Sequence, residues 1–302
     1  MNNTVGVVAA LVSSALGGTA GAITRYMIGA SDPQTLATFR FGIAFLLLLP
    51  LAVFVRSRWP PKVDLLGTIA LGALYFAGFF FLYNLSLSFT TAARGSLALA
   101  TLPLTTMLVA AALGKERLTR RKTIGVLTAV VGVALALVTG LRSAPIGAWR
   151  GDLIMVGATI IMAFYTVWSR AFVQRSSRLG FLVTGMGAGS VVSFLLAWSL
   201  GGIANVGNWT PALWIAGVAL GLLGGAAAFY LWSFALDHTT PTRVANTMTI
   251  NPVAAAAGGA ILLGEPIGLH LVLGIVAVAL GIWLASTEPL TTAAKSAANA
   301  NL

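Results

Sequence analysis

An internal repeat is the feature of this sequence that most constrains its fold. Thr90-Thr91-Ala92-Ala93-Arg94, Pro103 and Glu116 recur as Thr239-Thr240-Pro241-Thr242-Arg243, Pro252 and Glu265. Each landmark is displaced by the same 149 residues, since 252 minus 103 and 265 minus 116 both equal 149. In an apolar chain, such a repeat is typical of membrane bundles built from two related halves.

The composition places this repeat in lipid. Hydrophobic residues make up 58% of the 302 residues and charged residues only 8%, whereas soluble domains carry about a quarter charged residues. The net charge of +11 does not indicate nucleic-acid binding, because the basic residues lie in short loops between apolar stretches. The chain has no cysteine, hence no disulfide framework.

Ten stretches approach the roughly 20 apolar residues that a membrane-spanning helix needs. The predicted spans are Val5–Ile28, Thr35–Val55, Leu65–Ser86, Ala92–Leu113, Thr123–Gly140, Asp152–Phe172, Leu179–Leu200, Ala212–Leu236, Thr242–Leu263 and Leu269–Ser286. The first run has no basic residue before it and is too long for a signal peptide, so we expect a retained span.

Basic residues predict the orientation. They gather in the loops on the side of the N-terminus, at positions 56–62, 115–122 and 175–178, while the opposite loops hold little beyond Arg142 and Arg150. The positive-inside rule therefore places both termini in the cytoplasm. Arg outnumbers Lys, and Ala and Gly abound, which suggests a bacterium and hence its inner membrane.

Five spans per repeat is an odd number, so the two halves are expected to be inverted. We assign residues 5–140 and 150–286 to two five-helix repeats, and residues 287–302 to a disordered cytoplasmic tail. Inverted repeats place a substrate site near the membrane midplane, where they face each other, and allow alternating access to it. The predicted fold class is therefore an all-α membrane protein with ten transmembrane helices.

The chain resembles the EamA-type members of the drug/metabolite transporter superfamily. Leu263-Gly264-Glu265-Pro266 is similar to the turn after the family's ninth helix, and Gly114-Lys115-Glu116-Arg117 is a looser equivalent after the fourth. The resemblance implies export of small metabolites, often amino acids, through a cavity lined by helices 1–4 and 6–9. It also implies that the fifth and tenth helices are peripheral.

Two prolines lie inside predicted spans. Pro103 and Pro252 each remove a helix hydrogen bond and free a carbonyl, of Leu99 and Met248 respectively. In a bilayer such carbonyls find another hydrogen-bond donor or face a water-filled cavity. The breaks could therefore line a transport path or simply improve packing, and the neighbouring Asn246 and Asn251 favour a substrate-binding role for the ninth span.

Arg40 is the most informative charge. It lies within the second span, about seven residues or 10 Å past Pro33, where an arginine costs about 2.5–3.5 kcal/mol and should face protein or water. The loosely equivalent region near Gly185–Gly189 holds no arginine. We expect Arg40 to bind an anionic group of the substrate or to gate the outer side; the alternative is snorkelling to the interface.

Other charges lie at the ends of spans. Arg94 and Arg243 begin the fourth and ninth spans, and Glu116 and Glu265 follow their ends. We interpret them as anchors and gate-side pairs. Asp237 and His238 are expected to form a helix-end pair in solvent.

Aromatic residues are concentrated in the third, sixth and eighth spans. They favour a cavity for a ring-bearing or cationic ligand, although lipid contact explains any single ring equally well. The expected wall residues are Tyr75, Phe79, Tyr83, Trp168 and Tyr230.

No Asp or Glu occupies the middle third of a predicted span, so we expect transport without proton coupling. We predict no metal site and no cofactor. Gly125, Gly132, Gly274 and Gly281 are expected to let helix backbones approach closely, within a monomer or at a homodimer surface.

The sequence thus predicts a transporter whose partners are a small-molecule substrate and the lipid bilayer. Arg40 and the aromatic residues favour export of amino acids, aromatic ones above all, as by the YddG-type exporters of this superfamily. Efflux of amphipathic cationic drugs is the alternative, and a membrane scaffold or lipid scramblase is more remote. An intramembrane protease is disfavoured, because Ser190 would need a histidine at depth and both histidines lie at membrane edges.

Overall fold

The computed structural model describes residues 3–114, 120–239, 243–244 and 247–286, and every regular element in them is a helix. Seven helical stretches are long and apolar enough to cross a membrane. Three shorter apolar helices, Thr123–Thr139, Thr247–Leu263 and Leu269–Gly281, lie at the fifth, ninth and tenth predicted spans. The predicted all-α membrane fold is confirmed.

The first half contains α1 (Asn3–Met27), α2 (Pro33–Phe54), α3 (Lys62–Gly72), η1 (Ala73–Phe79), α4 (Phe80–Leu87), α5 (Ala92–Leu99), α6 (Leu102–Ala112), α7 (Arg120–Thr139) and the short η2 (Gly140–Ser143). The second contains α8 (Ala148–Arg175), α9 (Arg178–Ser199), η3 (Gly202–Asn208), α10 (Pro211–Ala219), η4 (Leu220–Ala227), α11 (Ala228–His238), η5 (Thr247–Thr249), α13 (Ile250–Leu263) and α14 (Leu269–Ser286).

Polar caps set where several helices begin. The Asp32 carboxylate accepts the backbone N–H groups of Gln34 and Thr35, both at 3.0 Å, and Pro33 occupies the first turn of α2. Thr91 caps α5 in the same way through the N–H of Arg94. Such caps satisfy N–H groups that have no partner inside the helix, so the chain can reverse direction at these points.

The fourth span is interrupted near its proline. α5 ends at Leu99 and α6 begins at Leu102, with Pro103 as its second residue. In the ninth span the 3-10 turn η5 precedes α13, whose third residue is Pro252. The expected interruptions are therefore present in both halves, while a role for them in transport stays a prediction.

Two π-helical segments lie at matching places in the repeat, which the sequence did not predict. Shifting η1 (Ala73–Phe79) by 149 residues gives 222–228, which overlaps η4 (Leu220–Ala227). Each widens one turn in the middle of a long span. π-helical turns are rare and often mark functional sites.

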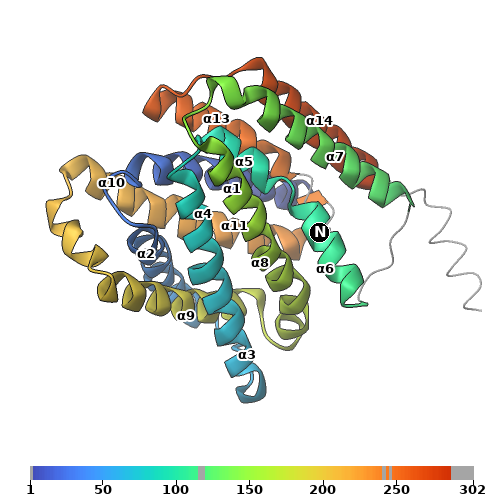
Figure 1. The fold of residues 1–302 in the computed structure, drawn as a ribbon. Coiled ribbons are helices and arrows are strands. Elements are labelled where there is room, and N and C mark those ends of the chain that lie inside the picture. The colour runs from blue at the N-terminus through green and yellow to red at the C-terminus, as the bar shows by residue number, and fades with distance from the viewer. Residues whose placement is uncertain (1–2, 115–119, 240–242, 245–246, 287–302) are drawn as a thin grey trace, which may run out of the picture.

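The two halves interlock rather than lie as separate bodies (Figure 1). α1 packs against α13 and α11 of the second half, and α8 packs in the corresponding way against α6 and α4 of the first. α2 packs on η4 as α9 packs on η1, and α2 also packs on α9. Any site between the halves is therefore built from both.

α7 and α14 lie side by side at the edge of the bundle (Figure 1). A Cβ added at Gly132 would lie 2.1 Å from the Cβ of Ala277, and one at Gly281 would lie 2.7 Å from the carbonyl oxygen of Gly125. These glycines therefore bring two helices of one chain into close contact.

Candidate functional site

Arg40 lies buried inside the bundle, with 4% of its surface exposed. Its Nε and Nη2 both donate to the carbonyl oxygen of Gly224 in η4, at 3.2 and 2.9 Å. Its Cζ lies 4.7 Å from the ring centroid of Phe80 and 5.5 Å from that of Phe41. The guanidinium thus connects the two halves, and its hydrogen bonds hold it inside the bundle and not at the membrane–water interface.

The third guanidinium nitrogen of Arg40 lacks an acceptor at normal hydrogen-bond geometry. Nη1 is buried and makes no such bond among the described residues, which is costly for a charged donor, although the Tyr83 hydroxyl lies close enough to interact with the guanidinium,. Gly189 occupies the matching contact in the other half, where its Cβ would lie 2.3 Å from the Cβ of Phe76 in η1. The cation therefore belongs to one half only.

The aromatic residues of the third span form a packed cluster beside Arg40. Tyr75 stacks on Tyr165 at 4.1 Å between ring centroids and on Phe79 at 5.2 Å. Tyr83 follows Phe79 at 5.9 Å, and its hydroxyl oxygen would lie 2.7 Å from a Cβ at Gly21 of α1. Three predicted wall residues are thus brought together near the predicted cation, in a closed arrangement.

The other two predicted wall residues differ in their surroundings. Tyr230 is half-buried, packs against the core cluster that contains Tyr75, Phe79 and Tyr83, and lies 6.4 Å from Phe234 on its own helix. Trp168 is 44% exposed and contacts Phe164 at 5.1 Å. A substrate-binding role for either stays a prediction.

Asn251 connects the two interrupted spans, because its Oδ1 accepts a hydrogen bond from the Ser96 hydroxyl at 2.6 Å. α1 passes very close to it. A Cβ at Gly18 would lie 2.2 Å from the Asn251 carbonyl oxygen. The second predicted residue of this pair, Asn246, lies outside the described residues.

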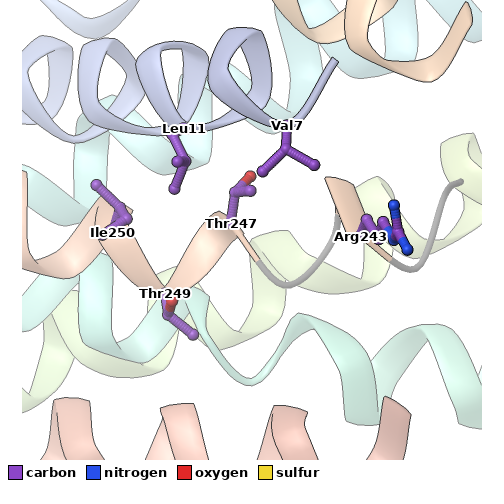
Figure 2. A pocket seen from close by; sticks show the side chains of 6 residues that line it. All are labelled: Val7, Leu11, Arg243, Thr247, Thr249 and Ile250. Atoms are coloured by element: carbon purple, nitrogen blue, oxygen red, sulfur yellow. The ribbon is translucent and has the colours of Figure 1, made fainter. Parts of the chain in front are cut away.

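A hollow of about 390 Å³ lies between α1 and the start of the ninth span. Figure 2 shows Val7 and Leu11 pointing from α1 toward Thr247, Thr249 and Ile250, with Arg243 farther along. Its walls are apolar on one side and carry hydroxyls and a cation on the other. Arg243, expected to gate, is an exposed residue of this hollow.

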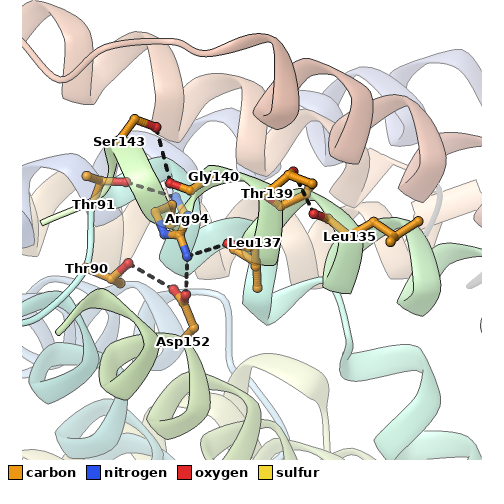
Figure 3. Close-up of polar contacts among 10 residues, drawn as sticks. Thr90, Thr91, Arg94, Leu135, Leu137, Thr139, Gly140, Ser143 and Asp152 are labelled. Carbon is orange, nitrogen blue, oxygen red and sulfur yellow. Dashed lines mark hydrogen bonds and ion pairs between the residues drawn. The ribbon is translucent and has the colours of Figure 1, made fainter. Parts of the chain in front are cut away.

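Arg94 is buried in an ion pair that the sequence analysis did not foresee (Figure 3). Its Nη2 lies 2.5 Å from Oδ2 of Asp152 at the start of α8 and also donates to the Leu137 carbonyl oxygen at 3.0 Å. The Thr90 hydroxyl donates to the other carboxylate oxygen at 2.9 Å. This network ties α5 to α7 and α8.

Glu265 forms a second polar network, which we name the Glu265 latch. Its Oε2 accepts the N–H of Ala92 at 3.0 Å, and its Oε1 lies 3.4 Å from Nε of Arg25. Arg25 also donates from Nη1 to the Leu87 carbonyl oxygen at 3.1 Å. These four residues join α1, α4, α5 and the turn after α13. Glu116, the repeat counterpart of Glu265, lies outside the described residues.

Ion pairs also connect helices at the opposite end of the bundle. Arg175 donates to both carboxylate oxygens of Asp64, at 2.6 and 2.7 Å. Asp237, expected to pair with His238, is instead ion-paired with Arg178 of α9. The His238 ring nitrogen Nδ1 lies 2.8 Å from the Phe234 carbonyl oxygen on its own helix.

Arg25, Asp64 and Asp152 are the polar residues that the sequence reasoning missed. Each begins or ends a span, where charges are common and uninformative. The available signals were Asp64 and Asp152, acidic residues at the starts of apolar runs. The partner of Asp152 is 58 residues away, so the pairing follows only from the packing of α5 against α8.

A helical bundle with interlocked repeated halves, interrupted spans and an arginine between them defines a membrane transporter. The family model described as the EamA-like transporter family matches residues 4–138 and 149–287. The chain belongs to this family.

Curated relatives agree with this class. The chain is 24% identical to the uncharacterized transporter YyaM of Bacillus subtilis, covering 87% of this chain and 88% of that protein. It is 31% identical to the uncharacterized protein PA1977 of Pseudomonas aeruginosa, at 83% and 84% coverage. It is 26% identical to a probable amino-acid metabolite efflux pump of Salmonella typhimurium, at 80% and 83% coverage.

A solved crystal structure has the same fold. It superposes with a TM-score of 0.65 at 21% identity and covers 94% of this chain and 95% of its own.

Proposed function

We propose that this transporter exports amino acids, with a preference for aromatic ones, by alternating access to a site that contains Arg40. The observation that carries the proposal is the buried Arg40 guanidinium, whose Nη1 makes no hydrogen bond of normal geometry among the described residues and whose polar neighbour is the Tyr83 hydroxyl. A substrate carboxylate would supply the missing acceptor. The likeness to a probable amino-acid metabolite efflux pump supports the same substrate class.

Ring preference follows from the surroundings of Arg40. Phe80 and Tyr83 lie within 5.6 Å of each other beside the guanidinium, and Tyr75 and Phe79 extend the aromatic surface. A substrate ring could replace one of these ring contacts without leaving apolar surface in water. Opening the packed cluster is then part of substrate binding.

Efflux of amphipathic cations is the alternative. It needs a buried carboxylate free to bind a cation, whereas the buried Asp152 is already paired with Arg94. We therefore place cationic drugs second. Transport is proposed to run down the substrate gradient, through two inverted repeats, with both termini in the cytoplasm of a bacterial cell.

Uptake into liposomes tests the proposal. Purified protein is reconstituted and screened with labelled amino acids, nucleosides and quaternary amines at equal pH on both sides. We expect flux of aromatic amino acids, and a loss of about ten- to hundred-fold in affinity for them in Arg40→Gln, because one charge-assisted hydrogen bond is removed. Flux of quaternary amines alone would contradict the proposal.

The proposed lack of proton coupling needs a separate measurement. A proton gradient imposed across the same liposomes should leave the final substrate distribution unchanged. Accumulation against the substrate gradient would show coupling instead.

A further inference from the structure

The Glu265 side chain folds back over the helix that precedes it. Gly264 ends α13 with a φ of 65°, and the N–H of Glu265 donates to the Gly259 carbonyl oxygen at 3.2 Å. A Cβ at Gly259 would lie 2.6 Å from Oε2 of Glu265. A Cβ at residue 259 would therefore displace the carboxylate from this position.

From that position the carboxylate spans the two halves. It accepts the first N–H of α5 in the first half, which has no partner inside its own helix,. It also holds Arg25, whose second bond is to the last turn of α4. Breaking the Glu265 latch would release the ends of α1, α4 and α5 from the turn after α13.

The sequence of the repeat differs at two positions on which the Glu265 arrangement depends. At the 149-residue offset, Ala92 corresponds to Pro241, which has no N–H to donate,. Gly259 corresponds to Ala110, which carries the Cβ that Gly259 lacks. Glu116 is thus present in the other half without the two features that Glu265 depends on.

Two buried polar groups lie beside the latch. The Thr24 hydroxyl and Oδ1 of Asn84 are buried and have no hydrogen-bond partner among the described residues. Thr24 precedes Arg25 on α1, and Asn84 lies on α4, whose last residue Leu87 accepts from Arg25. Unpaired polar groups inside a membrane bundle are expected where water or solute passes.

We propose that the Glu265 latch is the gate at its end of the bundle and that its opening exposes Thr24 and Asn84. The proposal rests on the transport function proposed above. Glu265 acts as a positioning residue, because it holds helix ends together and need not touch the substrate.

The absence of cysteine from the chain makes the gate measurable without any substrate. Thr24→Cys places one thiol beside the latch, and Leu11→Cys places one in the hollow between α1 and η5, toward the other end of α1. The rate of maleimide labelling of each is measured in purified full-length protein. The latch is removed by Glu265→Ala or by Gly259→Ala, and Glu116→Ala is the matched control.

We expect either latch variant to raise the labelling rate at Thr24→Cys about tenfold, because the hydrogen bonds of the Glu265 side chain to Ala92 and Arg25 are lost,. Labelling at Leu11→Cys should stay unchanged or fall. Glu116→Ala should change neither rate. An unchanged rate at Thr24→Cys in both latch variants, or an equal rise with Glu116→Ala, would overturn the proposal. A rise at both reporters would show general loosening of the fold and would also overturn it.

Because labelling needs no substrate, the gate can be confirmed even if the proposed amino-acid transport is wrong. Conversely, amino-acid flux together with unchanged labelling rates would support the transport function and contradict the gate proposal.

Discussion

Oδ2 of Asp152 lies 2.5 Å from Nη2 of Arg94, and both side chains are at least nine-tenths buried. A buried ion pair adds little net stability compared with a well-packed apolar pair, but removing one partner leaves an uncompensated charge. The Thr90 hydroxyl also donates to Asp152, and Arg94 also donates to the Leu137 carbonyl oxygen. Removing one partner of the pair should therefore destabilise the fold strongly.

We predict that Asp152→Asn lowers the free energy of unfolding by about 3–5 kcal/mol. Thermal unfolding in detergent, followed by the loss of monodisperse protein, measures the change. Asp237→Asn is the control, because Asp237 is 54% exposed and such pairs contribute about 0–1 kcal/mol. Equal effects of the two substitutions would mean that burial does not set the strength of the Arg94 pair.

Substrate preference separates the predicted wall residues. Tyr83 is buried beside Phe79 and Phe80, so Tyr83→Ala should weaken ring-bearing substrates more than small aliphatic ones. Trp168 is exposed and distinct from this cluster, so Trp168→Ala tests whether it joins the site when the bundle rearranges. Competition against a labelled aromatic amino acid gives both profiles. Uniform loss for all substrates in Tyr83→Ala would assign it to packing.

How much the sequence predicts depends on whether a feature is local. The apolar spans and the breaks near Pro103 and Pro252 are local patterns, and the structure contains apolar helices and helix interruptions there. The burial of Arg40 could also be predicted, because the free-energy cost of placing a charge in lipid applies to any charged residue within a span. Its contact with Gly224, 184 residues away, depends on how α2 packs on η4 and could not be predicted from the sequence.

The same limit explains what was missed at the ends of the spans. Arg25, Asp64 and Asp152 have partners between 58 and 240 residues away. The two π-helical segments were missed for a different reason. A π-helical turn changes the helix register by about one residue without a distinctive residue type, so only the backbone reveals it.

Orientation provides a separate test. A fluorescent reporter that folds only in the cytoplasm, fused after Ser286, should be bright if both termini are cytoplasmic. The same reporter placed in the 140–147 loop should be dark, because that loop is predicted to face the other side. A bright loop fusion together with a dark C-terminal fusion would reverse the orientation, and with it the side on which the Glu265 latch opens.

The Glu265 latch should respond to pH. Burial raises the pKa of Glu265, and its bonds to Ala92 and Arg25 only partly offset that rise. Since the pKa is higher in the closed latch than for a carboxylate in water, a proton binds the closed form more tightly. Acid therefore stabilises the closed latch, and this stabilisation is lost as the pH rises through the raised pKa.

Labelling of Thr24→Cys, corrected for the intrinsic reactivity of a free thiol at each pH, should accordingly speed up from acid to neutral pH. Glu265→Gln mimics the protonated side chain and should stay slow throughout, with no pH dependence. The other charged groups nearby are Arg25 on α1, Arg94 with Asp152, and His270 on α14, which lies against Gly140 and Gly268. His270→Gln is therefore the control and should keep the pH dependence. A pH response that survives Glu265→Gln and disappears in His270→Gln would assign the proton to the histidine.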